Sequence, residues 1–327
     1  MKKILAMFLI ALMILGLAAC AGKPTDAAVK TGLGIVFSNS NSKDPADGKD
    51  GTIDSQAYVA AVTVDKDGKV VKCVIDAMQS KFTFTTGSEI KTTADTVFKS
   101  KNELGNDYGM KKASKIQKEW FEQAAAFAAY CVGKTSDQIK NIAVTEGVAT
   151  DADLKSSVTV RIATFQDAVT KAIANAADVG AKASDKLGLA IEGAATQTQT
   201  LAKDGKPATA VAYNYYTATT FDANGKITSC IIDASQGKFV VENGKITTDL
   251  NAEIKTKNEL GDAYGMKKAS KIQKEWNEQA AAFAKFAVGK TVADVKGISL
   301  TEGAPSAGTD LASSVTVHVT SFINIIE

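Results

Sequence analysis

The sequence of 327 residues predicts an α+β fold made of two tandem repeats, each a small antiparallel sheet packed with helices. Residues 101–120 are repeated at 257–276 with 18 of 20 positions identical, so the chain contains two copies of one unit. In each unit, alternating apolar runs flank an Asp-Gly or Asn-Gly turn, which is typical of antiparallel hairpins. Apolar residues at helical spacing follow and predict the helices.

The composition is that of an ordinary globular protein, with 45% hydrophobic and 23% charged residues. The formal net charge of +2 falls to about zero once Lys2 and Lys3, which lie in a predicted signal peptide, are removed. This balance argues against nucleic acid as a partner. His318 is the only histidine. A Ser-His-Asp triad would therefore depend on that residue, and a multi-histidine zinc site is excluded.

The N-terminus reads as a bacterial lipoprotein signal. Lys2 and Lys3 precede a continuous apolar run over residues 4–17, which is too short to span a bilayer comfortably. The stretch Leu17-Ala18-Ala19-Cys20 resembles a lipobox, in which lipid is attached to the cysteine after cleavage. We expect a signal peptide at 1–19, a tether at 20–30 and a lipid anchor at Cys20 that holds the protein outside the cytoplasmic membrane. The alternative is a plain secretory signal cut near Ala19.

The mature chain divides into a first module at 31–177, a small-residue linker at 178–185 and a second module at 186–327. Three cysteines remain in it, at positions 73, 131 and 230. Their odd number argues against a disulfide framework, and we expect buried, inert thiols.

In the first module, residues 108–131 are predicted to form one helix that ends at Gly133. Its apolar stripe directs Trp120, and by repetition Trp276, toward the core. A second short helix is expected after a capping residue at Thr135, and its copy after Thr291.

Lysines occupy the opposite face of the predicted helix, at positions 111, 115 and 118, and again at 267, 271 and 274. A solvated helix face is one interpretation. The other is a surface shared by both copies, for a partner, an anionic group or the other copy, since even the outward residues are identical. Recent gene conversion between the copies would also explain that identity.

A late segment carries the family resemblance. Asp153-Leu154-Lys155-Ser156-Ser157-Val158-Thr159 and its copy at 310–316 are similar to the Asp-x-x-Ser-Gly-Ala-Thr motif of FMN-binding domains, which also occur in tandem in exported lipoproteins. The sequence departs from that motif at Ser157-Val158, where the family has Gly-Ala, and residues 156–160 are also compatible with a plain strand.

The resemblance implies that a flavin transferase links FMN through its phosphate to Thr159 and Thr316. Ser156 and Ser313 would then donate hydrogen bonds to the phosphates, and Tyr108 and Tyr264 would cover the flavin rings. The expected function is electron relay outside the membrane from a membrane dehydrogenase, so the protein is expected to be a carrier or binding protein rather than a catalyst.

Two other functions remain open. The first is a non-redox surface lipoprotein, a ligand-binding or structural module that keeps the fold without the flavin. The second is an enzyme with paired carboxylates at Asp76 and Asp233, which the sequence places at equivalent strand ends. One carboxylate per unit at a strand end is more typical of a turn than of a general base, so this second possibility has little support.

Overall fold

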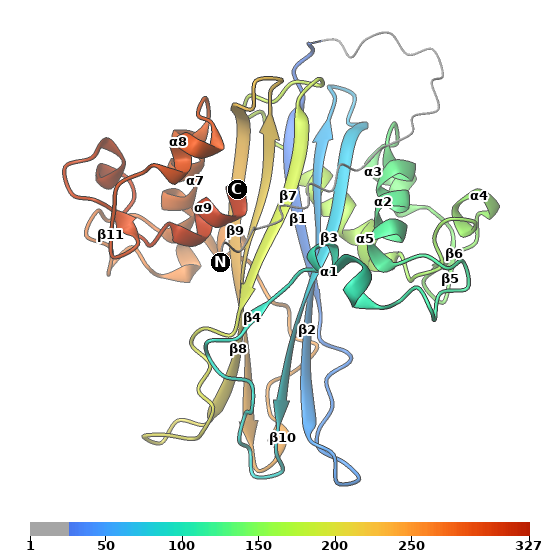
Figure 1. The fold of residues 1–327 in the computed structure, drawn as a ribbon, viewed down its shortest axis with the longest axis vertical. Coiled ribbons are helices and arrows are strands. Elements are labelled where there is room, and N and C mark those ends of the chain that lie inside the picture. The colour runs from blue at the N-terminus through green and yellow to red at the C-terminus, as the bar shows by residue number, and fades with distance from the viewer. Residues whose placement is uncertain (1–25) are drawn as a thin grey trace, which may run out of the picture.

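The computed structural model describes residues 26–327 and shows an elongated α+β molecule with two tandem repeats (Figure 1). The predicted signal peptide and the proposed lipid site at Cys20 lie outside the described residues. Within residues 26–327, none of the helices combines the length and apolar character that crossing a bilayer requires.

The two repeats contain the same elements in nearly the same order. The first has β1 (Lys30–Ser38), β2 (Gly51–Val64), β3 (Val70–Phe84), β4 (Val97–Phe98), α1 (Lys101–Leu104), η1 (Gly105–Tyr108), α2 (Trp120–Cys131), α3 (Ser136–Lys140), β5 (Val144–Thr145), β6 (Val148–Ala149), α4 (Ala152–Lys155) and α5 (Ala163–Ala174). The second has β7 (Lys186–Ala194), β8 (Ala208–Phe221), β9 (Ile227–Glu242), β10 (Lys245–Ile246), α6 (Lys257–Leu260), η2 (Gly261–Tyr264), α7 (Trp276–Ala287), α8 (Val292–Lys296), β11 (Leu300–Thr301), β12 (Ala304–Pro305), η3 (Asp310–Ser313) and α9 (Thr320–Ile326).

Both main sheets are antiparallel. Strands β1, β2 and β3 form one sheet in that order, and β9, β8 and β7 form the centre of the other. Strand β4 of the first repeat pairs with β7 of the second, so the two repeats share a sheet edge. The predicted hairpins are confirmed at 65–69 and 222–226. In the first hairpin, Asp65 accepts the backbone N–H groups of Asp67 and Lys69, and Gly68 adopts a positive φ of 74°.

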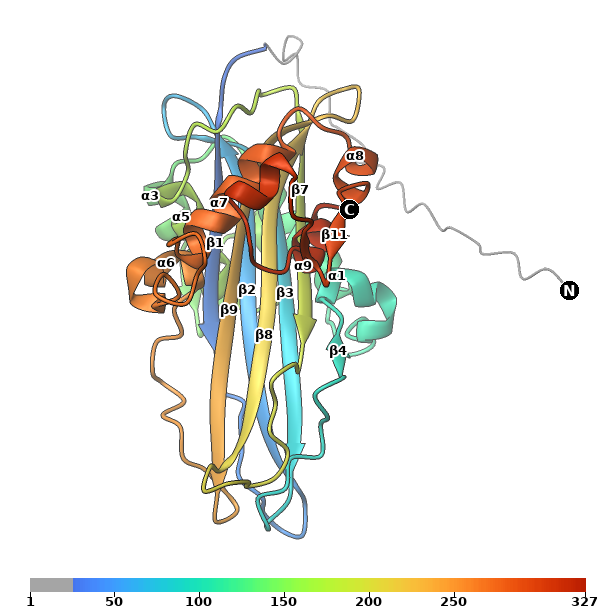
Figure 2. The ribbon, with the colours of Figure 1, turned by 90° about the vertical axis from the view of Figure 1, so that its left-hand side faces the viewer.

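The two sheets pack face to face with helices on both outer sides, which gives four layers (Figures 1 and 2). Alternate side chains of β2 point to the two faces of its sheet, and both faces are covered. Its residues 60, 62 and 64 pack in the first repeat's helix-facing core, whereas residues 57, 59 and 61 pack toward the other sheet. Both faces of this strand are therefore buried here, which explains the continuous apolar run over residues 57–62.

The core between the sheets binds the repeats into one body. Its upper part joins Leu33, Ile35 and Met78 to Ile191 and Tyr216 of the second repeat. Its lower part is rich in phenylalanine and alanine from both sheets and lies where the strands extend below the helices, as Figure 1 shows. Separating the repeats would expose this apolar surface, so the modules are expected to unfold together.

Two glycines let helix α5 lie directly on β1. A Cβ atom at Gly32 would be 2.0 Å from the carbonyl oxygen of Ala172, and one at Gly34 would be 2.1 Å from that of Ala168. The second repeat has Ala190 at the place of Gly34, and its corresponding helix α9 is shorter. The Gly-x-Gly pattern of β1 is therefore a packing requirement.

The sequence-based elements are partly wrong. The strand β1 was not expected, and the helix predicted over 108–131 begins only at Trp120. Residues 109–119 form an ordered loop instead, which starts at Gly109 with a φ of 75° and contains Gln117 with a φ of 53°. The expectation that Trp120 and Trp276 are buried is confirmed, as are the capped helices after Thr135 and Thr291.

We predict that Gly34→Ala lowers the free energy of unfolding by about 2 kcal/mol, because the new methyl group must push α5 away from β1. Gly87→Ala is the matched control, since its Cβ would meet only Thr85 Oγ1 at 3.6 Å and should change stability by less than about 1 kcal/mol. Urea unfolding measures both. Equal stability of the two variants would contradict the close packing of α5 on β1.

Candidate functional site

One buried carboxylate fixes the loop between η1 and α2 through hydrogen bonds to its backbone. Glu119, which is 3% exposed, accepts the backbone N–H groups of Met110 at 2.8 Å and Lys111 at 2.9 Å. It also stands at the N-cap position of α2, where its own N–H donates to Glu122. Glu275 makes the same bonds to Met266 and Lys267. This explains why the loop has one shape in both copies.

A buried glutamine connects this loop to the predicted flavin motif. Gln123 on α2 is fully buried, and its Oε1 accepts the N–H of Thr159 at 2.7 Å, the hydroxyl of Thr159 at 3.2 Å and the N–H of Val160 at 3.1 Å. Its Nε2 donates to Ser114 Oγ and to the carbonyl oxygen of Lys118. One amide thus joins the loop that precedes its own helix to the motif, which lies 36 residues further along the chain.

The second repeat reproduces this network. Gln279 is also fully buried, and it accepts from the N–H and hydroxyl of Thr316 at 2.8 and 3.2 Å and donates to Ser270 Oγ at 3.2 Å. Sequence reasoning missed both glutamines. The available signal was a polar residue, identical in the two copies, on the face of the helix that carries the buried apolar stripe.

The motif segment is a turn rather than a strand. Helix α4 ends at Lys155, and the N–H groups of Ser157 and Val158 both bond to the carbonyl oxygen of Leu154. The Val158 side chain is fully buried in the core, so it does not force an extended backbone. Thr159 follows half-buried, shortly before α5 begins at residue 163.

The motif serines are bound locally. The hydroxyl of Ser156 donates to the carbonyl oxygen of Asp153, and that of Ser313 donates to Asp310, each at 2.7 Å. Both hydroxyl oxygens can still accept a hydrogen bond, but their protons are engaged. Donation to a phosphate would require each hydroxyl to turn away from the helix carbonyl.

A cleft of about 530 Å³, within the usual range of small-molecule sites, opens beside Thr159. Its apolar wall comes from the loop, from β6 and from the motif, and Lys115 and Lys155 add two positive charges. The residues that line it are Met110, Ala113, Ser114, Lys115, Gln123, Val148, Lys155, Thr159 and Val160. Apolar surface with nearby ammonium groups suits a ligand that has a planar ring and a phosphate, so these residues fit FMN. Ala312 replaces Lys155 in the second repeat, which leaves one cation fewer there.

The predicted ring-covering tyrosines lie around two buried lysines instead of in this wall. The ammonium nitrogen of Lys101 is 5.0 Å from the ring centres of Tyr108 and Trp120 and 5.4 Å from that of Tyr58. Lys257 has Tyr264 and Trp276 in the equivalent places, at 4.6 and 4.7 Å, and its third ring is Tyr213 at 4.7 Å, which stands where the first repeat has Gln56. Burial lowers the pKa of both lysines to about 8. Aromatic faces attract a cation, so each ammonium is stabilised without a direct carboxylate partner.

Asp76 and Asp233 are buried within long strands and do not lie at strand ends, contrary to the sequence-based expectation. Oδ1 of Asp76 accepts the N–H groups of Ala77 and Asn102, and Asp233 does the same with Ala234 and Asn258. Burial raises the pKa of each carboxyl group to about 6, although these hydrogen bonds oppose the shift. The two residues join β3 to α1 and β9 to α6, which is a structural role.

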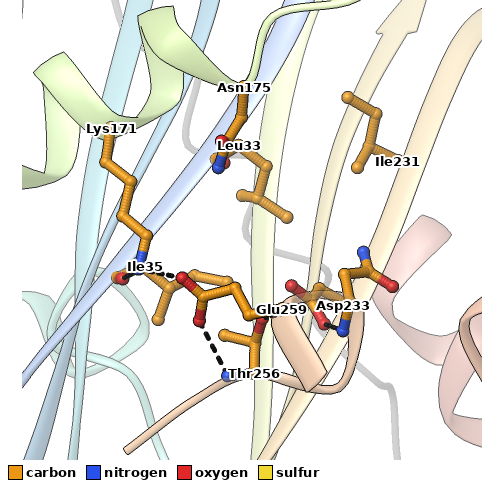
Figure 3. Close-up of a pocket in the computed structure, with 9 residues that line it drawn as sticks. Leu33, Ile35, Lys171, Asn175, Ile231, Asp233, Thr256 and Glu259 are labelled. Atoms are coloured by element: carbon orange, nitrogen blue, oxygen red, sulfur yellow. Dashed lines mark hydrogen bonds and ion pairs between the residues drawn. The ribbon is translucent and has the colours of Figure 1, made fainter. Parts of the chain in front are cut away.

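A second cleft of about 400 Å³ lies between the repeats, where α5 faces α6 (Figure 3). The Lys171 ammonium donates to the carbonyl oxygen of Ile35 and pairs with Glu259 at 2.5 Å. Burial favours the neutral form of Glu259, but the interactions with Lys171 and Thr256 together outweigh it and hold the pKa of that carboxyl below its usual range. Because its charged groups already have partners, this cleft is a seam between the repeats and offers weaker ligand chemistry than the cleft beside Thr159.

The thiols offer no alternative site. Cys73, Cys131 and Cys230 are free, and burial raises the pKa of each, which disfavours the reactive thiolate. Across the described part of the chain, His, Cys, Asp and Glu side chains do not gather in groups of three that suit a metal ion.

Comparison with models of known protein families, with curated proteins and with solved structures finds no match. The functional argument therefore depends on the geometry of this chain and on the resemblance of its late motif. The feature that both repeats share is a threonine hydroxyl held by a buried glutamine.

We predict that Gln123→Ala lowers the free energy of unfolding by about 3 kcal/mol, because it removes a buried amide and leaves the N–H groups of Thr159 and Val160 without their acceptor. It should also make the loop at 109–119 more sensitive to trypsin. Asn106→Asp is the control, since the second repeat already has Asp262 at that place. Wild-type stability and trypsin resistance of the Gln123→Ala variant would contradict this role.

The buried aspartates predict a specific pH dependence. Between about pH 4 and pH 6 the folded protein keeps protons on Asp76 and Asp233 that the unfolded chain has released. Each group therefore lowers the free energy of unfolding as pH rises, by on the order of 1 kcal/mol per pH unit. Compared with the variant carrying Asp76→Asn and Asp233→Asn, wild type should lose stability with rising pH across this window in urea unfolding. Parallel stability curves would show that these carboxyl groups are not perturbed.

Proposed function

We propose that the protein is a lipid-anchored electron carrier outside the cytoplasmic membrane, with FMN linked to Thr159 and Thr316. The observation that carries this proposal is the position of the Thr159 hydroxyl, half-buried at a cleft with apolar walls and two lysines. The turn before α5 supports it as well, because the family motif also leads into a final helix. A lipid on Cys20 would keep the flavins near a membrane dehydrogenase as electron donor.

The side chains have distinct tasks in this proposal. Gln123 accepts the Thr159 hydroxyl proton in a hydrogen bond, which leaves the oxygen lone pairs directed elsewhere. Lys115 and Lys155 offset the phosphate charge, while Met110 and Val160 provide apolar surface for the ring. When bound, FMN supplies the redox chemistry, and the chain supplies position and electrostatics.

Attachment is a phosphoryl transfer that needs a partner enzyme and an activated donor. A flavin transferase would use a flavin dinucleotide, break its phosphoanhydride bond and form a bond from Thr159 Oγ to the FMN phosphorus. The hydroxyl proton leaves to solvent or to the departing nucleotide. Neither oxidant nor reductant is consumed in this step.

The second candidate is a binding or structural lipoprotein without flavin. It is favoured by the Ser157-Val158 pair in place of Gly-Ala, and by the second repeat, where Ala312 replaces the cation at Lys155. In this alternative, Gln123 fixes the loop, and the Thr159 hydroxyl only completes the glutamine's hydrogen bonds.

We predict that coexpression with a flavin transferase gives a yellow protein whose mass rises by one or two FMN groups. Thr159→Val should remove one group, and the double change with Thr316→Val should remove both, because valine has no hydroxyl to esterify. Thr145→Val is the control, since Thr145 lies on the exposed strand β5 and should leave the flavin content unchanged. A colourless wild-type protein, or flavin retained in the double variant, would refute the proposal.

A further inference from the structure

Each repeat presents a nine-residue loop that contains four lysines. We call residues 110–118 and 266–274 the lysine loops, and their lysines are Lys111, Lys112, Lys115 and Lys118, and Lys267, Lys268, Lys271 and Lys274. Six of these side chains are exposed, and the last of each loop is half-buried. Within residues 26–327, the ion pairs of the structure involve none of the eight. The solvated helix face expected from the sequence is therefore a pair of cationic loops.

The positive charge of the molecule is unevenly distributed. The formal net charge of the whole chain is only +2, so the residues outside the lysine loops carry a net charge of −6. Each lysine loop is thus a pole of four positive charges, whereas the rest of the chain mixes 30 Lys and Arg with 36 Asp and Glu. Such a distribution favours binding of an anionic partner at these loops.

The loops are rigidly positioned and lie on opposite sides of the molecule. Glu119 and Gln123 hold the first loop through hydrogen bonds to residues 110, 111, 114 and 118, and the second loop has the same support. The first loop leads directly into α2 and the second into α7, and these helices flank the sheets on opposite sides (Figure 1). One long ligand, or two separate ones, can therefore reach both poles.

We propose that the lysine loops bind a flexible linear polyanion, whose phosphate or carboxylate groups contact several lysines at once. A protein partner is disfavoured, because protein interfaces are depleted in lysine and depend on apolar anchors. The exposed large hydrophobic side chains of the described residues all lie outside the loops, at positions 97, 132, 144, 201 and 288. Nucleic acid is disfavoured because the loops contain no aromatic residue on which a base can stack. This inference does not depend on the flavin.

The test measures binding of fluorescent polyphosphate to the whole mature protein by anisotropy, at low and at physiological salt. The loop variant changes Lys111, Lys112 and Lys118 to glutamine, together with Lys267, Lys268 and Lys274, and leaves the cleft residue Lys115 and its copy intact. We expect binding to weaken by about tenfold or more, and wild-type affinity to fall steeply with salt. Changing one loop alone should give an intermediate loss, because two sites add avidity.

The matched control removes six exposed lysines elsewhere, at positions 43, 49, 81, 99, 203 and 206, and should keep wild-type affinity. Poly-L-glutamate and oligo-dT of similar charge are compared with polyphosphate. Comparable or weaker binding of oligo-dT supports the proposal, whereas clearly tighter binding would indicate a nucleic-acid site instead. Absence of polyphosphate binding, or an equal loss in the loop and control variants, would overturn it. Because flavin content is measured separately, failure of this proposal and failure of the flavin proposal are distinguishable.

Discussion

One buried amide in each repeat organises the parts of the molecule that concern function. The side chain of Gln123 satisfies two backbone N–H groups and a hydroxyl on one side, and a serine and a carbonyl oxygen on the other. Unpaired buried polar groups are costly, so this set of bonds favours a single arrangement. The position of Thr159 follows from it, and together with Glu119 it determines the shape of the first lysine loop. Gln279 repeats the arrangement with the same atoms.

The packing of the two sheets determines where the hydrogen-bond networks of Gln123 and Gln279 lie in the molecule. Each sheet is buried by helices on one face and by the other sheet on the opposite face. The strand β4 of the first repeat completes the edge of the second repeat's sheet. The two repeats therefore form one rigid body, and their equivalent sites lie on opposite sides of it. Thr159 and Thr316 are separated by the two sheets, which matters for any relay between two flavins.

Much of the local structure could be predicted from the sequence because short-range chemistry decides it. The Asp-Gly and Asn-Gly turns fix the hairpins, and Thr135 and Thr291 cap their helices in the expected way. The prediction of a helix before Trp120 is wrong although the apolar spacing there is helical. The Glu119 carboxylate accepts the backbone N–H groups of residues 110 and 111 and holds this segment as a loop. That bond reaches back eight or nine residues along the chain, and periodicity does not reveal it.

The site was predicted only in part for the same reason. The late motif directs attention to Thr159, but its glutamine partner comes from a helix 36 residues earlier. The tyrosines expected near the flavin surround Lys101 and Lys257, two cations whose burial no local pattern indicates. In both cases the decisive contact is tertiary, and the repetition of the sequence was the best available pointer to it.

The most direct test of the account is the intact mass of the native protein, extracted from the membrane of its own host. The account predicts a chain that begins at a lipid-modified Cys20 and carries FMN on the peptides that contain Thr159 and Thr316. Recovery of both peptides without any adduct would contradict the redox function and leave a tethered binding module.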